Sequence, residues 1–118
     1  MLKALDFDNL HGERSYKGLR AYAISKLANI LFTYELDRRL RGTEVTANCL
    51  HPGTVRTGIW GAARGVLRPL ILLAQPFMIS AERGAQPLIK LASDPTCAAV
   101  SGRYFLKNKE VRSSPLTY

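Results

Sequence analysis

The chain has 118 residues, 47% of them hydrophobic, and a formal net charge of +8 from 17 Lys and Arg against 9 Asp and Glu. This length allows one domain at most, and the composition excludes a disordered chain or a fibre. The basic residues are dispersed and are not interleaved with aromatic side chains, so we expect no nucleic-acid partner in spite of the charge.

Cys49 and Cys97 are the only cysteines, and they form no Cys-x-x-Cys motif. The sequence therefore predicts no metal site and two free thiols. The first nine residues lack a long apolar run, so we expect no signal peptide. The apolar stretch 69–79 is far shorter than the roughly 20 residues of a membrane span. We expect a cytoplasmic protein with no transmembrane segment.

The first half of the chain predicts a loop, a long helix and a strand. Residues 1–18 hold no period and are expected to form a loop. Residues 19–41 predict a helix, because apolar residues recur at helical spacing and arginines crowd the last turn. Gly42 follows where a left-handed cap belongs. Residues 44–50 are short, partly β-branched and largely apolar, which predicts a strand covered on both faces.

The second half predicts an excursion, a helix and a second strand. Glycines and prolines interrupt residues 55–79, so short helices in a mobile excursion are expected there. Ser80 is the expected cap of a helix over 81–93, which Pro87 should kink or shorten. Residues 102–106 predict a strand, and residues 107–118 a polar tail. The expected apolar face of the 81–93 helix consists of Ala81, Ala85, Leu88, Ile89 and Ala92.

This order of elements predicts an α/β fold with parallel strands and a right-handed crossover. Two parallel strands do not make a stable sheet by themselves. Either they pair with strands outside this chain, or the sequence is a piece of a longer one. The long connection between the strands contains extra residues, and extra loops in such folds usually cover a ligand.

Tyr22 and Lys26 are four residues apart on the 19–41 helix, which places both side chains on one face, one turn apart. A neighbouring ammonium favours the phenolate form of a tyrosine. A phenol tuned in this way can exchange a proton with an alcohol or carbonyl oxygen. The pair therefore indicates carbonyl and alcohol redox chemistry, although Tyr-x-x-x-Lys alone is a weak motif.

The residues around this pair make the pattern specific. Residues 21–29 read Ala-Tyr-Ala-Ile-Ser-Lys-Leu-Ala-Asn, residues 50–57 read Leu-His-Pro-Gly-Thr-Val-Arg-Thr, and residues 101–105 read Ser-Gly-Arg-Tyr-Phe. In this order and at this spacing the sequence resembles the short-chain dehydrogenase/reductase family, in its retinol-dehydrogenase-like and WW-domain-oxidoreductase-like branch. The resemblance covers nearly the whole chain and is weakest between residues 59 and 78.

The resemblance implies the C-terminal half of a Rossmann-like, doubly wound parallel sheet, incomplete in this chain. Tyr22 would be the catalytic acid/base, and Lys26 would hydrogen-bond the nicotinamide ribose and favour the Tyr22 phenolate. Pro52 and Gly53 would turn the chain at the carboxyl edge of the sheet, where ligands bind in such folds. Val55 and Thr57 would contact the nicotinamide end of NAD or NADP, with NADP favoured, and residues 58–79 would form a substrate lid.

Other residues have alternative roles. Ser25 and Asn29 either touch the cofactor or a proton relay, or hydrogen-bond along their helix, while His51 is expected to be structural. Trp60, Phe77 and Met78 either line an apolar substrate pocket or pack in the lid or core. Tyr104 and Phe105 are expected in the core.

Parts of the family pattern are absent from this sequence. It has no glycine-rich turn to meet the pyrophosphate, no Asn-Ala-Gly segment and no match to the family's catalytic serine or tetrad asparagine. The resemblance therefore implies part of an NAD(P)-dependent oxidoreductase whose substrate is a small alcohol or carbonyl compound, with lipophilic compounds among the candidates. We expect this isolated chain to be inactive. Both ends look clipped, as in a fragment, an incomplete gene model or a decayed copy.

The alternative is a non-enzymatic interaction module that forms a homo-oligomer or associates with a full-length relative. In the family, the helix with the Tyr-Lys pair often packs in a dimer interface. The apolar residues that would serve here are Ile30, Leu31, Phe32 and Leu36.

Overall fold

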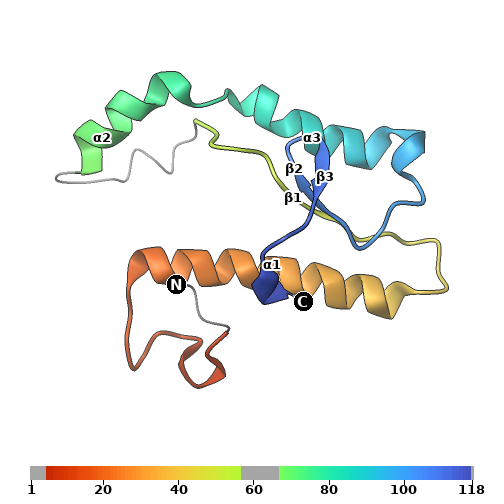
Figure 1. Ribbon diagram of the computed structural model, residues 1–118, viewed down its shortest axis with the longest axis horizontal. Coiled ribbons are helices and arrows are strands. Elements are labelled where there is room, and N and C mark those ends of the chain that lie inside the picture. The colour runs from red at the N-terminus through yellow and green to blue at the C-terminus, as the bar shows by residue number, and fades with distance from the viewer. Residues whose placement is uncertain (1–4, 57–66, 118) are drawn as a thin grey trace. The chain divides into compact units, whose positions relative to one another are not determined.

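A computed structural model describes residues 5–56 and 67–117 of the chain (Figure 1). These residues belong to two compact units. The first comprises Met1–Cys49, Val100–Tyr104 and Glu110–Tyr118, and the second Leu50–Ala99 and Phe105–Lys109. Helices and short strands are mixed, with one three-stranded sheet, which is compatible with a partial Rossmann-like fold.

The long helix of the first unit is α1, Gly18–Leu40, which confirms the helix expected over 19–41 within one residue at each end. Leu27 is its buried apolar residue, and the other apolar residues at the expected spacing are half-buried. Beyond the C-cap Arg41, Gly42 has a φ of +87°, the left-handed conformation that its place in the sequence predicted. Before α1, the expected loop contains one short 3₁₀ turn, Phe7–Asn9.

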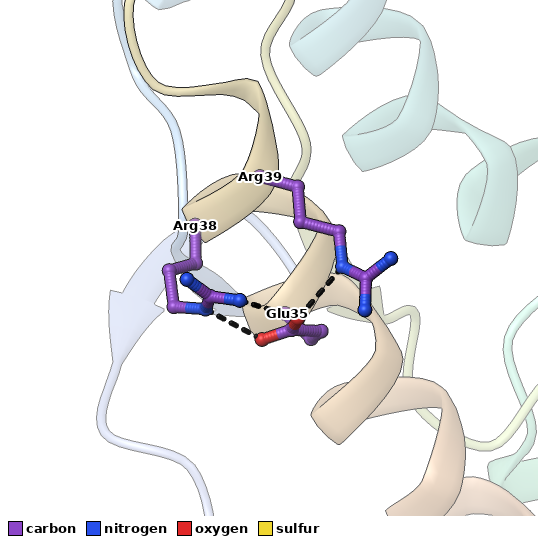
Figure 2. A network of polar contacts seen from close by, with 3 residues as sticks. All are labelled: Glu35, Arg38 and Arg39. Atoms are coloured by element: carbon purple, nitrogen blue, oxygen red, sulfur yellow. Dashed lines mark hydrogen bonds and ion pairs between the residues drawn. The ribbon is translucent and has the colours of Figure 1, made fainter.

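An ion-pair network covers the C-terminal part of α1 (Figure 2). Arg38 Nε lies 2.7 Å from one carboxylate oxygen of Glu35, and Arg39 Nε lies 2.7 Å from the other. These pairs hold the pKa of Glu35 down to about 2, mainly through the hydrogen bonds from the two guanidinium groups. Arg38 and Arg39 thus share one carboxylate within the helix, which leaves a net positive charge near its C-terminal end.

The strand expected over 44–50 is wrong for most of its length, because strand β1 spans only Cys49–His51. In the residues before β1, hydrogen bonds from side chains take the place of regular backbone hydrogen bonds between strands. The Asn48 amide donates to Val100 O at 2.6 Å and accepts from Arg103 N at 3.0 Å. Ala47 N donates to Ser101 Oγ at 3.0 Å, and Gly102 N donates to Ala47 O at 2.8 Å. Side-chain bonding of this kind offers the backbone an alternative to the sheet.

Asp37 connects α1 to the segment 100–104. Its carboxylate accepts a hydrogen bond from Ser101 Oγ at 2.5 Å, and the same hydroxyl accepts from Ala47 N. Gly102 has a φ of +66°, and a Cβ added there would lie 2.6 Å from Asp37 Oδ2. The close approach of the carboxylate and the backbone conformation both require glycine at this position.

The sheet has the order β1-β2-β3, where β2 is Tyr104–Leu106 and β3 is Lys109–Val111. Cys49 N donates to Arg103 O and Lys107 N donates to His51 O, so β1 and β2 run parallel, as the sequence predicted. The expected strand 102–106 is confirmed for its last three residues. The polar tail expected over 107–118 is wrong, because the chain turns back at Lys107, which has a φ of +57°, and forms β3.

Residues 113–117 also contact α1. They form a 3₁₀ turn, Pro115–Thr117, in which Thr117 is buried. Tyr34 Oη on α1 donates to Ser113 Oγ at 2.7 Å. Hydrogen bonds between hydroxyl groups hold these residues against α1. The spacing of apolar residues along the sequence cannot predict such a contact.

The second unit contains α2 (Leu67–Ala74), a 3₁₀ turn (Gln75–Phe77) and α3 (Ala81–Ser93). These confirm the expected short helices in the described part of 55–79, and the expected bounds of the 81–93 helix. Ser80 caps α3 by accepting from Arg83 N at 3.3 Å. The helix runs through Pro87 without being shortened, and Pro87 is buried.

The buried face of α3 differs from the expected one. Gly84 and Pro87 are buried, whereas Leu88 and Ile89 are 60% and 52% exposed. The helix therefore packs through its small residues, because a neighbouring segment approaches its backbone closely at Gly84.

The hydrophobic core within the described residues is small. Leu27 and Ala47 are its buried apolar residues. Many large apolar side chains are exposed, among them Leu19, Phe32, Leu73 and Phe77.

Candidate functional site

The Tyr22–Lys26 pair lies on α1 with the two side chains together. Lys26 Nζ lies over the Tyr22 ring, 5.3 Å from the ring centroid. A cation in this position is attracted by the ring quadrupole. Both side chains are exposed, Tyr22 by 56%. The helical spacing thus presents a phenol and an ammonium side by side to a ligand that approaches this face.

The neighbours of the pair serve the helix in this structure. Ser25 Oγ donates to Tyr22 O at 2.7 Å, and the Asn29 carbonyl accepts from Thr33 Oγ1 at 2.9 Å. Ser25 therefore hydrogen-bonds along its own helix, which is one of the two roles that the sequence left open for it. The Asn29 side chain is exposed, and its role stays a prediction.

The second group of candidate residues, Pro52, Gly53 and Val55, directly follows β1. His51 Nδ1 accepts a hydrogen bond from Gly53 N at 2.8 Å, which assigns His51 the structural role expected of it. Gly53 has a φ of +100°, with Lys107 Cε 3.3 Å and Ile79 Cδ1 3.6 Å from the position of an added Cβ. This glycine makes the bend that the His-Pro-Gly sequence predicted, while Thr57 and Trp60 lie outside the described residues.

Ile79 and Gly84 hold the segment after this bend. Val55 and Ile79 form an isolated parallel bridge, in which Arg56 N donates to Ile79 O at 2.9 Å and Ile79 N to Thr54 O at 3.0 Å. Val55 also lies against Gly84 of α3. Sequence reasoning missed both contacts, since neither residue belongs to a motif and the partners are 24 or more positions apart.

The candidate residues fall into two groups. Tyr22 and Lys26 belong to the first unit, and Pro52, Gly53 and Val55 to the second. Phe77 is 87% exposed and therefore does not pack in the core. Met78 is half-buried.

The first unit has two hollows that neither Tyr22 nor Lys26 lines. One of about 820 Å³ lies beside Asp37, Arg41, Tyr104 and Arg112, and one of about 400 Å³ lies between residues 5–17 and the first half of α1. Tyr104 and Phe105 are half-buried, and burial raises the pKa of the Tyr104 phenol above its ordinary value. Both cysteines are free, and burial raises the pKa of the Cys49 thiol.

Within residues 5–56 and 67–117, no three His, Cys, Asp or Glu side chains are grouped so that they could hold a metal ion. Over the same residues, no helix combines the length and apolar character that crossing a membrane requires.

Comparison with known proteins finds no matching protein-family model. Individual relatives match over nearly the whole chain. Human retinol dehydrogenase 14 is 47% identical over 117 residues, covering 94% of this chain and 34% of the relative. The mouse protein of that name is also 47% identical, over 114 residues. Human retinol dehydrogenase 13 is 42% identical over 120 residues, covering 94% of this chain and 35% of the relative.

The chain thus spans about one third of the length of the curated relatives it matches, less than the half that the motifs suggested. The residues that carried the resemblance lie on α1, in the turn after β1 and at β2. This chain is therefore similar to about one third of the length of the retinol dehydrogenases, which agrees with the short-chain dehydrogenase/reductase resemblance of its motifs.

Proposed function

We propose that this chain forms the catalytic part of an NAD(P)-dependent oxidoreductase that interconverts an alcohol and a carbonyl compound. The observation that carries the proposal is the Lys26 ammonium 5.3 Å from the centre of the Tyr22 ring on an exposed face of α1. The names of the relatives support the reaction class, since the three reported above are retinol dehydrogenases.

The two side chains have distinct tasks in this chemistry. In carbonyl reduction, Tyr22 Oη donates a proton to the carbonyl oxygen as the hydride reaches the carbon, and in alcohol oxidation it accepts that proton. The Lys26 ammonium stabilises the phenolate left behind and has donors free for ribose hydroxyls. The nicotinamide cofactor, NAD or NADP, supplies or accepts the hydride when bound.

The residues of the second unit suit the nicotinamide end of that cofactor. Gly53 turns the chain directly after β1, and Val55 follows in a segment fixed by backbone hydrogen bonds to Ile79. Rigid backbone at the carboxyl end of a strand is where ligands bind in open α/β sheets. We assign Pro52, Gly53 and Val55 to this contact, with Thr57 as the next residue of the same motif.

We propose a lipophilic, retinoid-like alcohol or aldehyde as the substrate. Support comes from α2 and the following turn, where Leu72, Leu73 and Phe77 are 55%, 73% and 87% exposed. Apolar side chains on such a segment suit a lid over an apolar ligand. We also propose that the 118 residues alone do not turn over, since no glycine-rich phosphate-binding turn is present in them.

The test is a chimera in which this chain replaces the matching third of human retinol dehydrogenase 14. We expect Tyr22→Phe to lower kcat by about 10²- to 10⁴-fold, with little change in cofactor affinity. Tyr16→Phe is the matched control, because Tyr16 is also exposed (72%) but precedes α1. Retained turnover in Tyr22→Phe would refute the assignment.

Lys26→Met in the same chimera tests the second role. Loss of the ammonium should weaken cofactor binding and lower kcat, because the donors assigned to the ribose hydroxyls and the cation beside the Tyr22 ring are both removed. An unchanged kcat together with unchanged cofactor affinity contradicts the role.

A second candidate function is association with a full-length relative or a second copy of this chain. The observation that favours it is the exposure of Phe32 on α1, by 66%, near the half-buried Ile30, Leu31 and Leu36. Size-exclusion chromatography with light scattering, with and without human retinol dehydrogenase 14, tests it. A monomer in both runs rules against this function.

A further inference from the structure

The segment 53–56 is held at several points, all within the second unit. Gly53 N donates to His51 Nδ1 at 2.8 Å, and Ile79 N donates to Thr54 O at 3.0 Å. Arg56 N donates to Ile79 O at 2.9 Å. Bonds on both sides of Val55 leave its backbone little freedom to shift.

The Val55 side chain meets α3 at Gly84, which lies in the first half of the helix and is buried. A Cβ added to Gly84 would lie 2.7 Å from Val55 Cγ2 and 3.2 Å from Cγ1. Real Cβ atoms essentially never approach another heavy atom to 2.7 Å. Neither partner can yield easily, because a β-branched side chain is stiff at χ1 and the α3 backbone is hydrogen-bonded on both sides of Gly84.

The glycine has no conformational reason to be at this position. Its φ is outside the positive range, and glycine is a poor residue for a helix interior. The close approach of Val55 explains why a glycine is present in this helix. Only a hydrogen atom at the Gly84 Cα, in place of a side chain, leaves room for Val55.

We propose that Gly84 is a positioning residue for the cofactor, acting through Val55. By letting Val55 lie directly on α3, it sets the place of the backbone at 54–56, the segment assigned above to the nicotinamide end. This inference rests on the proposed function for its ligand, and on the contacts of the second unit for its geometry. No motif in the sequence singles out Gly84 for this role.

The first measurement is amide hydrogen exchange in the full 118-residue chain. In Gly84→Ala, exchange at the Arg56 and Ile79 amides should be at least about tenfold faster, since overpacking pushes Val55 off the helix. Gly18→Ala is the matched control. It places the same methyl group on a helical glycine whose nearest neighbour is Tyr16 Oη at 4.0 Å, so exchange at both amides should not change.

Removing the obstacle should restore the segment. In the double variant Gly84→Ala with Val55→Ala, the two alanine Cβ atoms would be 3.6 Å apart, an ordinary contact. Exchange at Arg56 and Ile79 should then return to within about threefold of the original rates, because the two changes act on one contact. If exchange at these two amides stays fast in the double variant, the proposal is wrong. The same test applies if Gly84→Ala alone unfolds the chain, because the double variant should then fold again.

The second measurement uses the chimera with human retinol dehydrogenase 14. Gly84→Ala should raise the KM for the nicotinamide cofactor about tenfold, whereas the KM for the alcohol stays within about twofold, because the displaced segment faces the cofactor. Val55→Ala should reverse most of the increase. A simple loss of stability would move both constants together.

The outcomes separate the two proposals. If the chimera turns over and Gly84→Ala leaves the cofactor KM unchanged, the positioning role is wrong and the oxidoreductase proposal stands. If the unmodified chimera neither binds cofactor nor turns over, the oxidoreductase proposal fails and with it the cofactor role of Gly84. The exchange data then still decide whether Gly84 positions Val55.

Discussion

The contact between Gly102 and Asp37 allows a stability prediction with an internal control. Gly102→Ala imposes two separate costs. An alanine at a φ of +66° costs about 1–2 kcal/mol, because its Cβ crowds the following carbonyl oxygen. The new Cβ would also lie 2.6 Å from Asp37 Oδ2, so the carboxylate has to move away from Ser101 Oγ.

The second cost follows from the lost hydrogen bond. A hydrogen bond to a charged group contributes about 1.5–3 kcal/mol, and the half-buried setting of Asp37 favours the lower end. We therefore expect Gly102→Ala to lower the free energy of unfolding by about 3 kcal/mol. The measurement is equilibrium denaturation in urea, followed by circular dichroism at 222 nm.

Gly42→Ala is the matched control, because Gly42 also has a positive φ, +87°, but nothing lies within 4 Å of an added Cβ. It should show only the conformational cost of about 1–2 kcal/mol. In an Asp37→Ala background, the cost of Gly102→Ala should fall to the same value. Equal losses at the two glycines, or an unchanged cost in that background, would refute the reasoning.

Two further predictions concern titration. The depressed pKa of Glu35, about 2 against 4.5, means that its ion pairs stabilise α1 fully above pH 4.5 and are lost as the pH falls toward 2. Glu35→Gln should therefore reduce the loss of helical circular dichroism between pH 5 and 2. Glu44→Gln should leave the loss of helical circular dichroism unchanged, since within the described residues Glu44 has no hydrogen bond or ion pair. Identical acid profiles for the original chain, Glu35→Gln and Glu44→Gln would contradict this prediction. Burial raises the pKa of the Cys49 thiol, so iodoacetamide at pH 8 should alkylate Cys49 more slowly in the folded chain than in urea. Peptide mass spectrometry reads the rate, and equal rates in both states would show the prediction to be wrong.

Local sequence signals were enough for the two best-defined helices. The spacing of apolar residues and the arginines near its end placed α1 within one residue, and Ser80 placed the start of α3. The same helical spacing predicted that Tyr22 and Lys26 lie together, which the 5.3 Å distance confirms. Their roles in catalysis stay predictions.

Contacts between distant residues decided what the sequence predicted wrongly. The Asn48 side chain bonds to Val100 and Arg103, more than 50 positions away, and a strand signal read from residues 44–50 cannot include that competition. The buried face of α3 followed the approach of Val55 to Gly84 rather than its leucine and isoleucine side chains.

For this chain, the sequence alone determined the two helices, the spacing of the phenol and the ammonium, and the relationship to the retinol dehydrogenases. Tertiary structure decided where β1 begins, that the C-terminal residues return as β3, and which residues hold Val55. Helical periodicity and capping depend on residues within one or two turns of each other, which can be read along the chain. Strand limits and buried faces depend on which distant side chains meet, and only the folded chain specifies that.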